Sequence, residues 1–205
     1  MESAVLLSTA YLAPVEYYFQ MCNHPQVIIE AHCNYIKQTY RNRCVIATAA
    51  GCQTLSIPVV KSDSLKCRTK DIRIAEHGNW RHLHWNAIIS AYNSTPFLEY
   101  YEDDFSRFYE KPAGFLFDYN EELRELICSL LDISPKISYS NEYITSIQPE
   151  VLDLREVIHP KKEPYIQNPN PYHQVFEMKY GFQANLSIID LLFNKGPESV
   201  FWLLK

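Results

Sequence analysis

Glycine is scarce in this chain of 205 residues: there are only five, and none lies in a Gly-rich phosphate-binding pattern. Neither G-x-x-x-x-G-K-[ST] nor G-x-G-x-x-G occurs, which excludes the nucleotide-binding loops built on those motifs. No apolar run approaches the roughly 18 residues of a membrane span, so none is expected. The first residues, M-E-S-A-V-L-L-S, lack the positive charge that opens a secretory signal.

Blocks of positive charge and paired cysteines are also absent. The formal net charge is −5, and like charges nowhere form a long block. A nucleic-acid partner requires a basic face, so we discount that class. The six cysteines are spread along the chain without a C-x-x-C pair. Their spacing favours reduced thiols in a cytoplasmic protein over a disulfide framework or a zinc site, and we expect neither a metal nor another cofactor.

Short apolar runs interleaved with helical patterns indicate the fold class. The runs predict strands at 4–8, 27–31, 44–48, 54–60, 72–75, 137–140 and 175–178, with a hairpin around Gly51. Helices are expected after Pro14, from Trp80, after Asp118 and from Ile188, with Asn79, Asp118 and Ser187 as their caps. Proline recurs between 148 and 171, where we expect a long ordered loop. These elements predict a single α/β layered domain over residues 1–205, in which a mixed, mostly parallel sheet is flanked by helices and carries a β-hairpin insertion.

The segment Y-I-K-Q-T-Y-R-N-R, residues 35–43, is a local cationic exception in an acidic chain. In an extended conformation Lys37, Arg41 and Arg43 would share one side, beside Tyr35 and Asn42. Cations among planar side chains suit phosphate, carboxylate or sugar ligands. A solvated loop face is the alternative for the cations, and a turn-holding role is the alternative for Asn42.

Two histidines are candidates for proton transfer. His84 lies on the apolar stripe of its predicted helix, where a hydrogen-bonded core histidine is the commoner outcome. His32 follows the second strand beside Cys33, and histidine is the usual general base near neutral pH. Tyr11 follows the first strand, where loops of open α/β sheets meet ligands, although packing explains it equally well.

Several motifs together resemble the WbqC-like family of bacterial O-antigen and surface-polysaccharide gene clusters. They are Y-L-A-P-V-E-Y-Y, Y-I-K-Q-T-Y-R-N-R, L-S-I-P-V, N-W-R-H-L-H-W with A-Y-N-S-T-P-F, and N-L-S-I-I-D-L-L-F-N-K-G-P-E-S, spread over residues 11–199. Between Ser140 and Tyr172 this chain lacks a segment that longer members carry, with a serine pair and a G-G-x-x-Y-L stretch.

The resemblance implies a transferase that moves an acyl or aminoacyl group, possible glycyl transfer included, onto an activated sugar. In that scheme Lys37, Arg41 and Arg43 hold phosphate, and Tyr11, Tyr35, Asn42 and Trp80 contact the sugar ligand. His84 or His32 removes a proton, and the partner is a small phosphorylated or glycosidic molecule. A non-catalytic ligand-binding or scaffold protein of the same pathway is the main alternative, and a cysteine hydrolase using Cys33 or Cys44 is a minor one. Oligomeric state is open.

Overall fold

A computed structural model describes residues 3–61 and 67–204. Within them, four parallel strands form one sheet in the order β5-β2-β1-β6: β1 (Ala4–Ser8), β2 (Val27–Glu30), β5 (Ile137–Tyr139) and β6 (Val151–Asp153). Counted along the chain, the strands lie in the order 3-2-1-4. This is the central part of a doubly wound α/β sheet, whose strand order reverses between β1 and β6.

Burial on both faces explains why the central strand β1 reads as a continuous apolar run. Val5, Leu6 and Leu7 are fully buried one after another, so neither face of β1 reaches solvent. Parallel sheets covered by helices on both sides show this pattern rather than an alternation of apolar and polar residues.

The antiparallel hairpin predicted around Gly51 is confirmed. Strands β3 (Arg43–Thr48) and β4 (Gly51–Ser56) pair in register and form a second, two-stranded sheet. Gly51 has a φ of 105°, which a residue with a side chain rarely adopts. The predicted α/β class, with parallel strands, flanking helices and a hairpin, is therefore confirmed.

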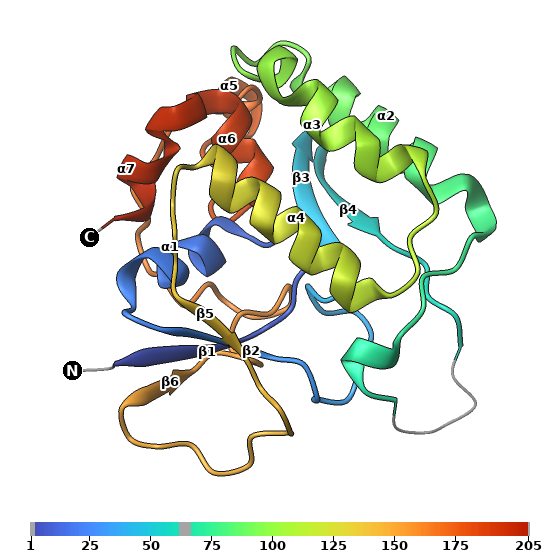
Figure 1. Cartoon of the computed structure of the whole chain (residues 1–205). Helices are drawn as coiled ribbons and strands as arrows, with labels where there is room; N and C mark the ends of the chain where they lie inside the picture. The colour runs from blue at the N-terminus through green and yellow to red at the C-terminus, as the bar shows by residue number, and fades with distance from the viewer. Residues whose placement is uncertain (1–2, 62–66, 205) are drawn as a thin grey trace.

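The helices that cover the two sheets form two groups (Figure 1). Helix α1 packs against α7 and α6, whereas α2 packs against the hairpin strand β3 and against α3. The long helix α4 crosses the front of the molecule between these groups (Figure 1). The helices of the described residues are α1 (Val15–Asn23), α2 (Trp80–Tyr92), α3 (Leu98–Glu110), α4 (Leu116–Leu130), α5 (Glu177–Tyr180), α6 (Ile188–Lys195) and α7 (Val200–Leu203), with 3-10 turns η1 (Thr69–Asp71), η2 (His77–Asn79) and η3 (Gly196–Ser199). None of these helices combines the length and the apolar character needed to cross a bilayer.

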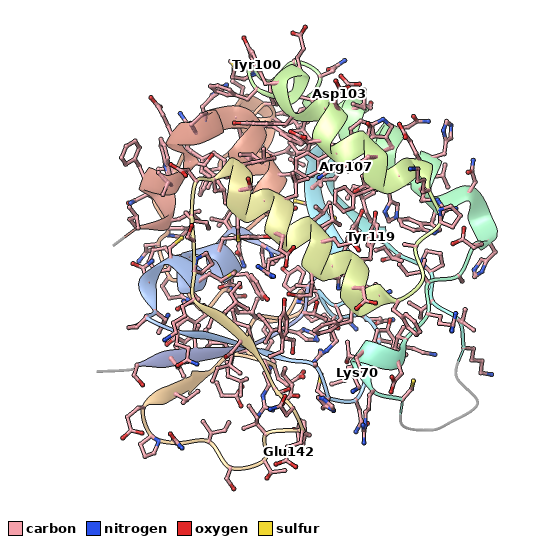
Figure 2. All side chains as sticks on the ribbon, in the orientation of Figure 1. Lys70, Tyr100, Asp103, Arg107, Tyr119 and Glu142 are labelled. Carbon is pink, nitrogen blue, oxygen red and sulfur yellow. The ribbon has the colours of Figure 1, made fainter. Side chains whose placement is uncertain are left out.

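An aromatic layer fills the space between α4 and the α2–α3 pair. Tyr119 of α4 lies in this layer, and its ring centroid is 5.9 Å from that of Trp80 and 5.9 Å from that of Phe108 (Figure 2). Below the sheet in the same view, the loop that carries Glu142 connects β5 to β6 (Figure 2). The aromatic side chains of this layer therefore form part of the hydrophobic core.

Three sequence predictions of local structure differ from the structure. The predicted strand at 175–178 is wrong, because this stretch begins a turn that leads into the short helix α5. Residues 72–75 make only isolated bridges, Val59 to Ile74 and Arg73 to Phe115, rather than a strand. The predicted loop at 148–171 contains strand β6. Its three residues are all half-buried, and the strand is too short for its sequence to show an apolar pattern.

Asn79 and Ser187 occupy the N-cap positions of α2 and α6 as predicted, but neither side chain makes a capping hydrogen bond, and the predicted cap at Asp118 is wrong. Asn79 has a φ of 48° and makes no capping hydrogen bond. Asp118 lies in the first turn of α4 rather than before it. The Ser187 hydroxyl donates to the carbonyl oxygen of Leu12, 2.7 Å away, instead of receiving a bond from its own helix. At Ser187 a tertiary contact has therefore replaced local capping.

Gly196 ends α6, and its position leaves no room for a side chain. Its φ is 56°, and a Cβ atom built there would lie 2.5 Å from the Phe97 ring. We expect Gly196→Ala to lower the free energy of unfolding by about 1–3 kcal/mol through strain and overpacking. Gly114→Ala is the matched control, because nothing lies within 4 Å of the added atom. Equal urea midpoints for the two variants would contradict this account.

Candidate functional site

The carboxyl ends of the parallel strands form the candidate site. In open α/β sheets ligands bind outside these ends, at the point where the strand order reverses. Here that point lies between β1, which ends at Ser8, and β6, which ends at Asp153. Polar side chains from several loops meet there.

Arg41 is the central side chain of this edge, and only 2% of its surface is exposed. Its Nη2 donates to Ser8 Oγ (2.8 Å) and to Glu156 Oε1 (2.6 Å), and lies 3.6 Å from Cys33 Sγ. Its Nη1 is 3.4 Å from Thr39 Oγ1. One guanidinium therefore joins the end of β1 to the segments that follow β2 and β6.

The Arg41 guanidinium keeps one unused donor. Its Nε is buried and has no hydrogen-bond partner within residues 3–61 and 67–204. The backbone of the same residue is held by α4, because Asn120 Nδ2 donates to the Arg41 carbonyl oxygen at 2.8 Å. Asn120 is fully buried, and its side chain fixes the backbone of Arg41 to α4.

A cavity next to Arg41 is very small. It has a volume of about 10 Å³, which is room for about one water molecule. Residues from the ends of β1 and β6 and from the 39–41 turn line it: Leu7, Ser8, Thr9, Ala10, Tyr17, Thr39, Tyr40, Arg41, Leu154, Arg155 and Ile158. The guanidinium and its partners thus fill the place where a deeper crevice would lie.

Basic side chains from the proline-rich segment fold back onto this edge. Lys162 Nζ donates to the Glu156 carbonyl oxygen (2.7 Å), and Lys161 Nζ donates to Gln38 Oε1. His159 Nδ1 accepts from the Lys161 amide at 3.0 Å. Both lysine side chains are exposed and His159 is half-buried.

These residues and Arg41 share one electrostatic environment, and we call them the basic cluster (Arg41, His159, Lys161 and Lys162). Partial burial lowers the pKa of His159, and the charges of Lys162, Lys161 and Arg41 lower it further, against an opposing effect of Glu156. The histidine thus experiences a positive potential from residues far apart in sequence. Such a potential favours an anionic ligand.

Glu30, at the end of β2, is fully buried and fully engaged. Its carboxylate accepts from Ser140 Oγ (2.7 Å), the amides of His32 (2.8 Å) and Ile144 (3.0 Å), and Arg155 Nη1 (3.0 Å). Burial alone would raise the pKa of Glu30, but these donors and the Arg155 charge hold it below its usual value. This carboxylate therefore links the end of β2 to the segments that follow β5 and β6.

The predicted cations near residue 40 do not share one side. Gln38 has a φ of 62°, and residues 37–41 form turns, so the alternation expected of a strand does not apply. Lys37 is exposed, Arg43 is half-buried at the start of β3, and Arg41 is sealed. Burial raises the pKa of Tyr35 to about 12, while Arg43 and Arg41 lower it, which places Tyr35 close to both.

The side chain of Asn42 is engaged in a hydrogen bond, whereas the ring of His32 is not bonded to the described residues. Asn42 Nδ2 donates to the Ile57 carbonyl oxygen at 2.9 Å, so this amide fixes the chain that returns from the hairpin. The amide of His32 is held by Glu30, while its half-buried ring makes no hydrogen bond with the described residues. His32 precedes Cys33, the thiol that contacts Arg41.

His84 lies in the core, with both ring nitrogens engaged. The ring donates to the Ser56 carbonyl oxygen, so its Nδ1 accepts from the Tyr11 hydroxyl at 3.0 Å. Tyr11 in turn shares a 2.8 Å hydrogen bond with Tyr109, and Trp80 packs edge-on against His84 at 5.1 Å. Burial lowers the pKa of His84 to about 4. The histidine is therefore a neutral member of an aromatic core.

Sequence reasoning missed the contribution of His159, Lys161 and Lys162. The stretch H-P-K-K-E-P carried a signal, since it places three basic side chains close to one another and to two prolines in an acidic chain. Its contact with the 38–41 turn depends on long-range folding and could not be read from local pattern. The described residues include no group of three or more His, Cys, Asp or Glu side chains arranged for a metal ion, and all six thiols are free.

Comparison with known proteins matches residues 9–169 to the WbqC-like protein family. The chain belongs to this family. The whole basic cluster lies inside the WbqC-like range, whereas the terminal stretch 185–199 lies beyond it. Over 227 aligned positions the chain is 23% identical to Uncharacterized protein Rv1507c of Mycobacterium tuberculosis, with 99% of this chain and 98% of that protein covered. No solved structure matches the chain significantly.

The low pKa of His84 predicts an acid-sensitive step in the stability of this WbqC-like protein. Because the folded-state pKa is below the unfolded value, the stabilisation is present above about pH 6.5 and is lost as the pH falls towards about 4. The shift corresponds to roughly 3 kcal/mol in the free energy of unfolding. Urea unfolding at several pH values should show a flatter acid limb for His84→Gln. His82→Gln, an exposed change on the same helix, is the control; unchanged acid limbs in both would refute this role.

Proposed function

We propose that the protein binds a small phosphorylated or glycosidic ligand at the carboxyl edge of its parallel sheet. The observation that carries this proposal is Arg41: a buried guanidinium with an unused Nε, located where the strand order reverses. Its carboxylate partner, Glu156, has half of its side chain exposed. Arginine suits phosphate because its planar fork can donate two parallel hydrogen bonds.

The remaining basic cluster supports an anion at this edge. Lys161 and Lys162 are exposed beside Glu156 and Gln38, so a phosphate at the mouth of the site would meet ammonium groups as well as the guanidinium. Tyr35 and Arg43 lie next to Arg41, and we include them, with the exposed Lys37, as contacts for the ligand. In this proposal Tyr11, Asn42 and Trp80 support the site from the core.

The start of α1 is not available for the phosphate, unlike the corresponding helix in dinucleotide-binding folds. Its first amides are already paired: Val15 with the Leu186 carbonyl oxygen (3.0 Å) and Glu16 with Asn185 Oδ1 (3.0 Å). The negative side chain of Glu16 also lies in the first turn. Recognition of an anion therefore rests on side chains rather than on a helix terminus.

We further propose that the ligand is an activated sugar of surface-polysaccharide metabolism in the cytoplasm, and that an acyl or aminoacyl group is transferred to it. A general base would remove a proton from the acceptor as the acyl carbon bonds to it and the donor's leaving group departs. Of the two predicted histidines, His32 is the better candidate, since its ring is free of hydrogen bonds within the described residues. His84 has no free nitrogen and serves in the core.

A non-catalytic ligand-binding or scaffold protein of the same pathway is the second candidate. The small volume of the cavity beside Arg41, about 10 Å³, favours it, because a reaction centre needs space for two substrates. The two candidate functions predict different effects of removing the His32 ring. Replacing His32 by alanine should abolish transfer without weakening ligand binding if the protein is an enzyme, and should change nothing measurable if it is not.

The basic cluster predicts a charge-dependent affinity for nucleotide sugars. We expect Lys161→Ala combined with Lys162→Ala to weaken binding of a uridine-diphosphate sugar by roughly tenfold, with a smaller difference at high salt. Titration calorimetry with the wild type and the double variant measures this. Lys111→Ala, an exposed lysine after α3, controls for the loss of charge; equal weakening by both changes would argue against this site.

Glu156 predicts an effect in the opposite direction. Glu156→Gln removes the carboxylate that competes for Arg41, so we expect inorganic phosphate to bind several-fold more tightly to the variant. The free energy of unfolding should fall by about 1–3 kcal/mol in the absence of phosphate, because a buried cation loses its charged partner. A phosphate affinity that is unchanged or weaker in Glu156→Gln would exclude Arg41 as the anion-binding group.

A further inference from the structure

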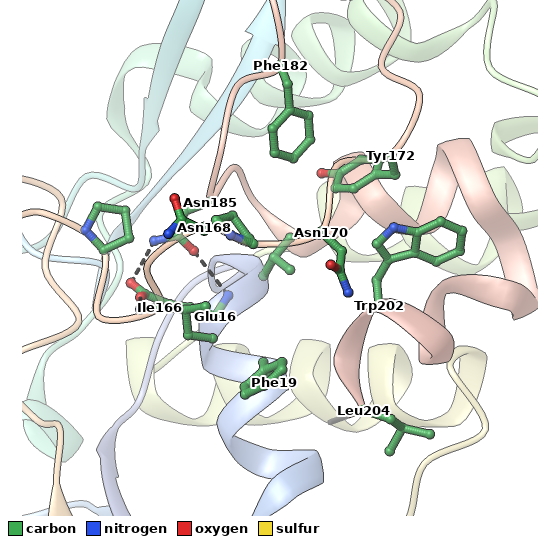
Figure 3. A pocket seen from close by; sticks show the side chains of 13 residues that line it. Glu16, Phe19, Ile166, Asn168, Asn170, Tyr172, Phe182, Asn185, Trp202 and Leu204 are labelled. Carbon is green, nitrogen blue, oxygen red and sulfur yellow. Dashed lines mark hydrogen bonds between the residues drawn. The ribbon is translucent and has the colours of Figure 1, made fainter.

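A second hollow, separate from the carboxyl edge, lies where α1, the 164–172 segment and α7 meet (Figure 3). Its volume is about 270 Å³. Four rings from different parts of the chain form its walls, and we call it the aromatic pocket: Phe19, Tyr172, Phe182 and Trp202. None of its lining residues belongs to the basic cluster.

The walls of the aromatic pocket are already fixed in place. The Tyr172 hydroxyl donates to Asp190 Oδ2 at 2.7 Å, and Trp202 Nε1 donates to the Pro171 carbonyl oxygen at 3.2 Å. The Tyr172 ring meets Phe182 at 82° and Trp202 at 77°, so the rings enclose a corner rather than stack. A ligand would enter without reordering these side chains, which favours binding.

The volume limits what the pocket can hold. It exceeds the roughly 150 Å³ that suffices for benzene and falls below the roughly 300 Å³ at which sites for drug-sized ligands begin. A single ring or a short branched apolar group is therefore the right size.

Glu16 adds a buried charge to this apolar setting. Only 3% of the residue is exposed, and it lines the pocket. Its carboxylate accepts from Asn185 Nδ2 at 2.6 Å (Figure 3). It also accepts from the Tyr165 amide (2.7 Å) and, more weakly, from the Ile166 amide (3.4 Å), so all three donors are neutral. No Lys, Arg or His among the described residues forms an ion pair with it.

The donors leave one acceptor position of Glu16 unused. A carboxylate has about four lone-pair directions, and the three donors occupy three of them. Burial raises the pKa of this carboxyl, so its ionised form is poorly compensated and would be stabilised by a positive charge.

The pocket chemistry selects for a cation with an apolar body. Aromatic faces attract ammonium groups, and one face of Trp202 already carries Lys195 Nζ at 4.9 Å from the ring centroid. An anion would be repelled by Glu16. We propose that the aromatic pocket binds a primary amine carried on a ring or short apolar group, with the ammonium at Glu16 and the apolar part among the four rings.

A purely structural role for Glu16 makes a different prediction. In that case the carboxylate only fastens the 165–166 backbone and Asn185 to the start of α1, where the helix dipole favours a negative charge. The pocket would then take neutral and charged ligands of one shape equally well.

Benzylamine and benzyl alcohol distinguish these roles, since they share size and shape and differ in charge. Both can be titrated at about pH 8, where the amine is protonated and the carboxyl ionised, while the Trp202 indole N–H resonance is followed by NMR. We expect benzylamine to bind roughly tenfold more tightly than benzyl alcohol and this preference to vanish in Glu16→Gln. Equal affinities in the wild type, or no change in the Trp202 signal with either ligand, would overturn the proposal.

Two further variants keep the test decisive if Glu16→Gln does not fold. Phe182→Ala removes a half-exposed wall and should weaken both ligands by a similar factor. Phe201→Ala, a neighbour of Trp202 that is 69% exposed and outside the pocket, should leave both affinities unchanged. Loss of binding in Phe201→Ala as well, or full retention in Phe182→Ala, would place the ligands elsewhere and refute the proposed pocket.

Discussion

The buried guanidinium of Arg41 is the interaction on which the carboxyl edge of the sheet depends. It bonds to Ser8 at the end of β1, to Glu156 after β6 and to Cys33 after β2, while Asn120 of α4 holds its backbone. A lysine could not replace it, because one ammonium lacks the fork that reaches these partners together. The same residue is therefore a structural tie and the proposed anion contact.

In the proposed function, this double role of Arg41 explains why the site offers only a small cavity. Buried cations require partners, and here the partner is an acidic side chain that remains half in solvent. A ligand phosphate would take over part of that pairing instead of entering an empty cavity. Recognition then depends on an exchange of anions at the surface of the protein.

The sequence allowed the α/β class, strands β1 and β2, the hairpin and helices α2, α4 and α6 to be predicted, because each shows a compact apolar run, a turn at glycine or a clear helical stripe. It failed for β6 and for 175–178, where a few residues take their structure from neighbours far along the chain. In the candidate site, Arg41 and its position after β2 could be predicted. The turn at Gln38, which separates Lys37 from Arg41, and the return of Lys161 and Lys162 depend on tertiary contacts that no local pattern encodes.

The segment between β6 and α5, residues 154–176, contributes to both the carboxyl-edge site and the aromatic pocket. It contains no helix or strand. It carries His159, Lys161 and Lys162 near its start and continues past Tyr165 and Ile166, whose amides donate to Glu16, to the walls of the aromatic pocket. Any occupant that pulls this stretch towards α1 also shifts the lysines at its other end. If an occupant does so, thermodynamic reciprocity requires an anion at those lysines to change the affinity for that occupant by the same factor.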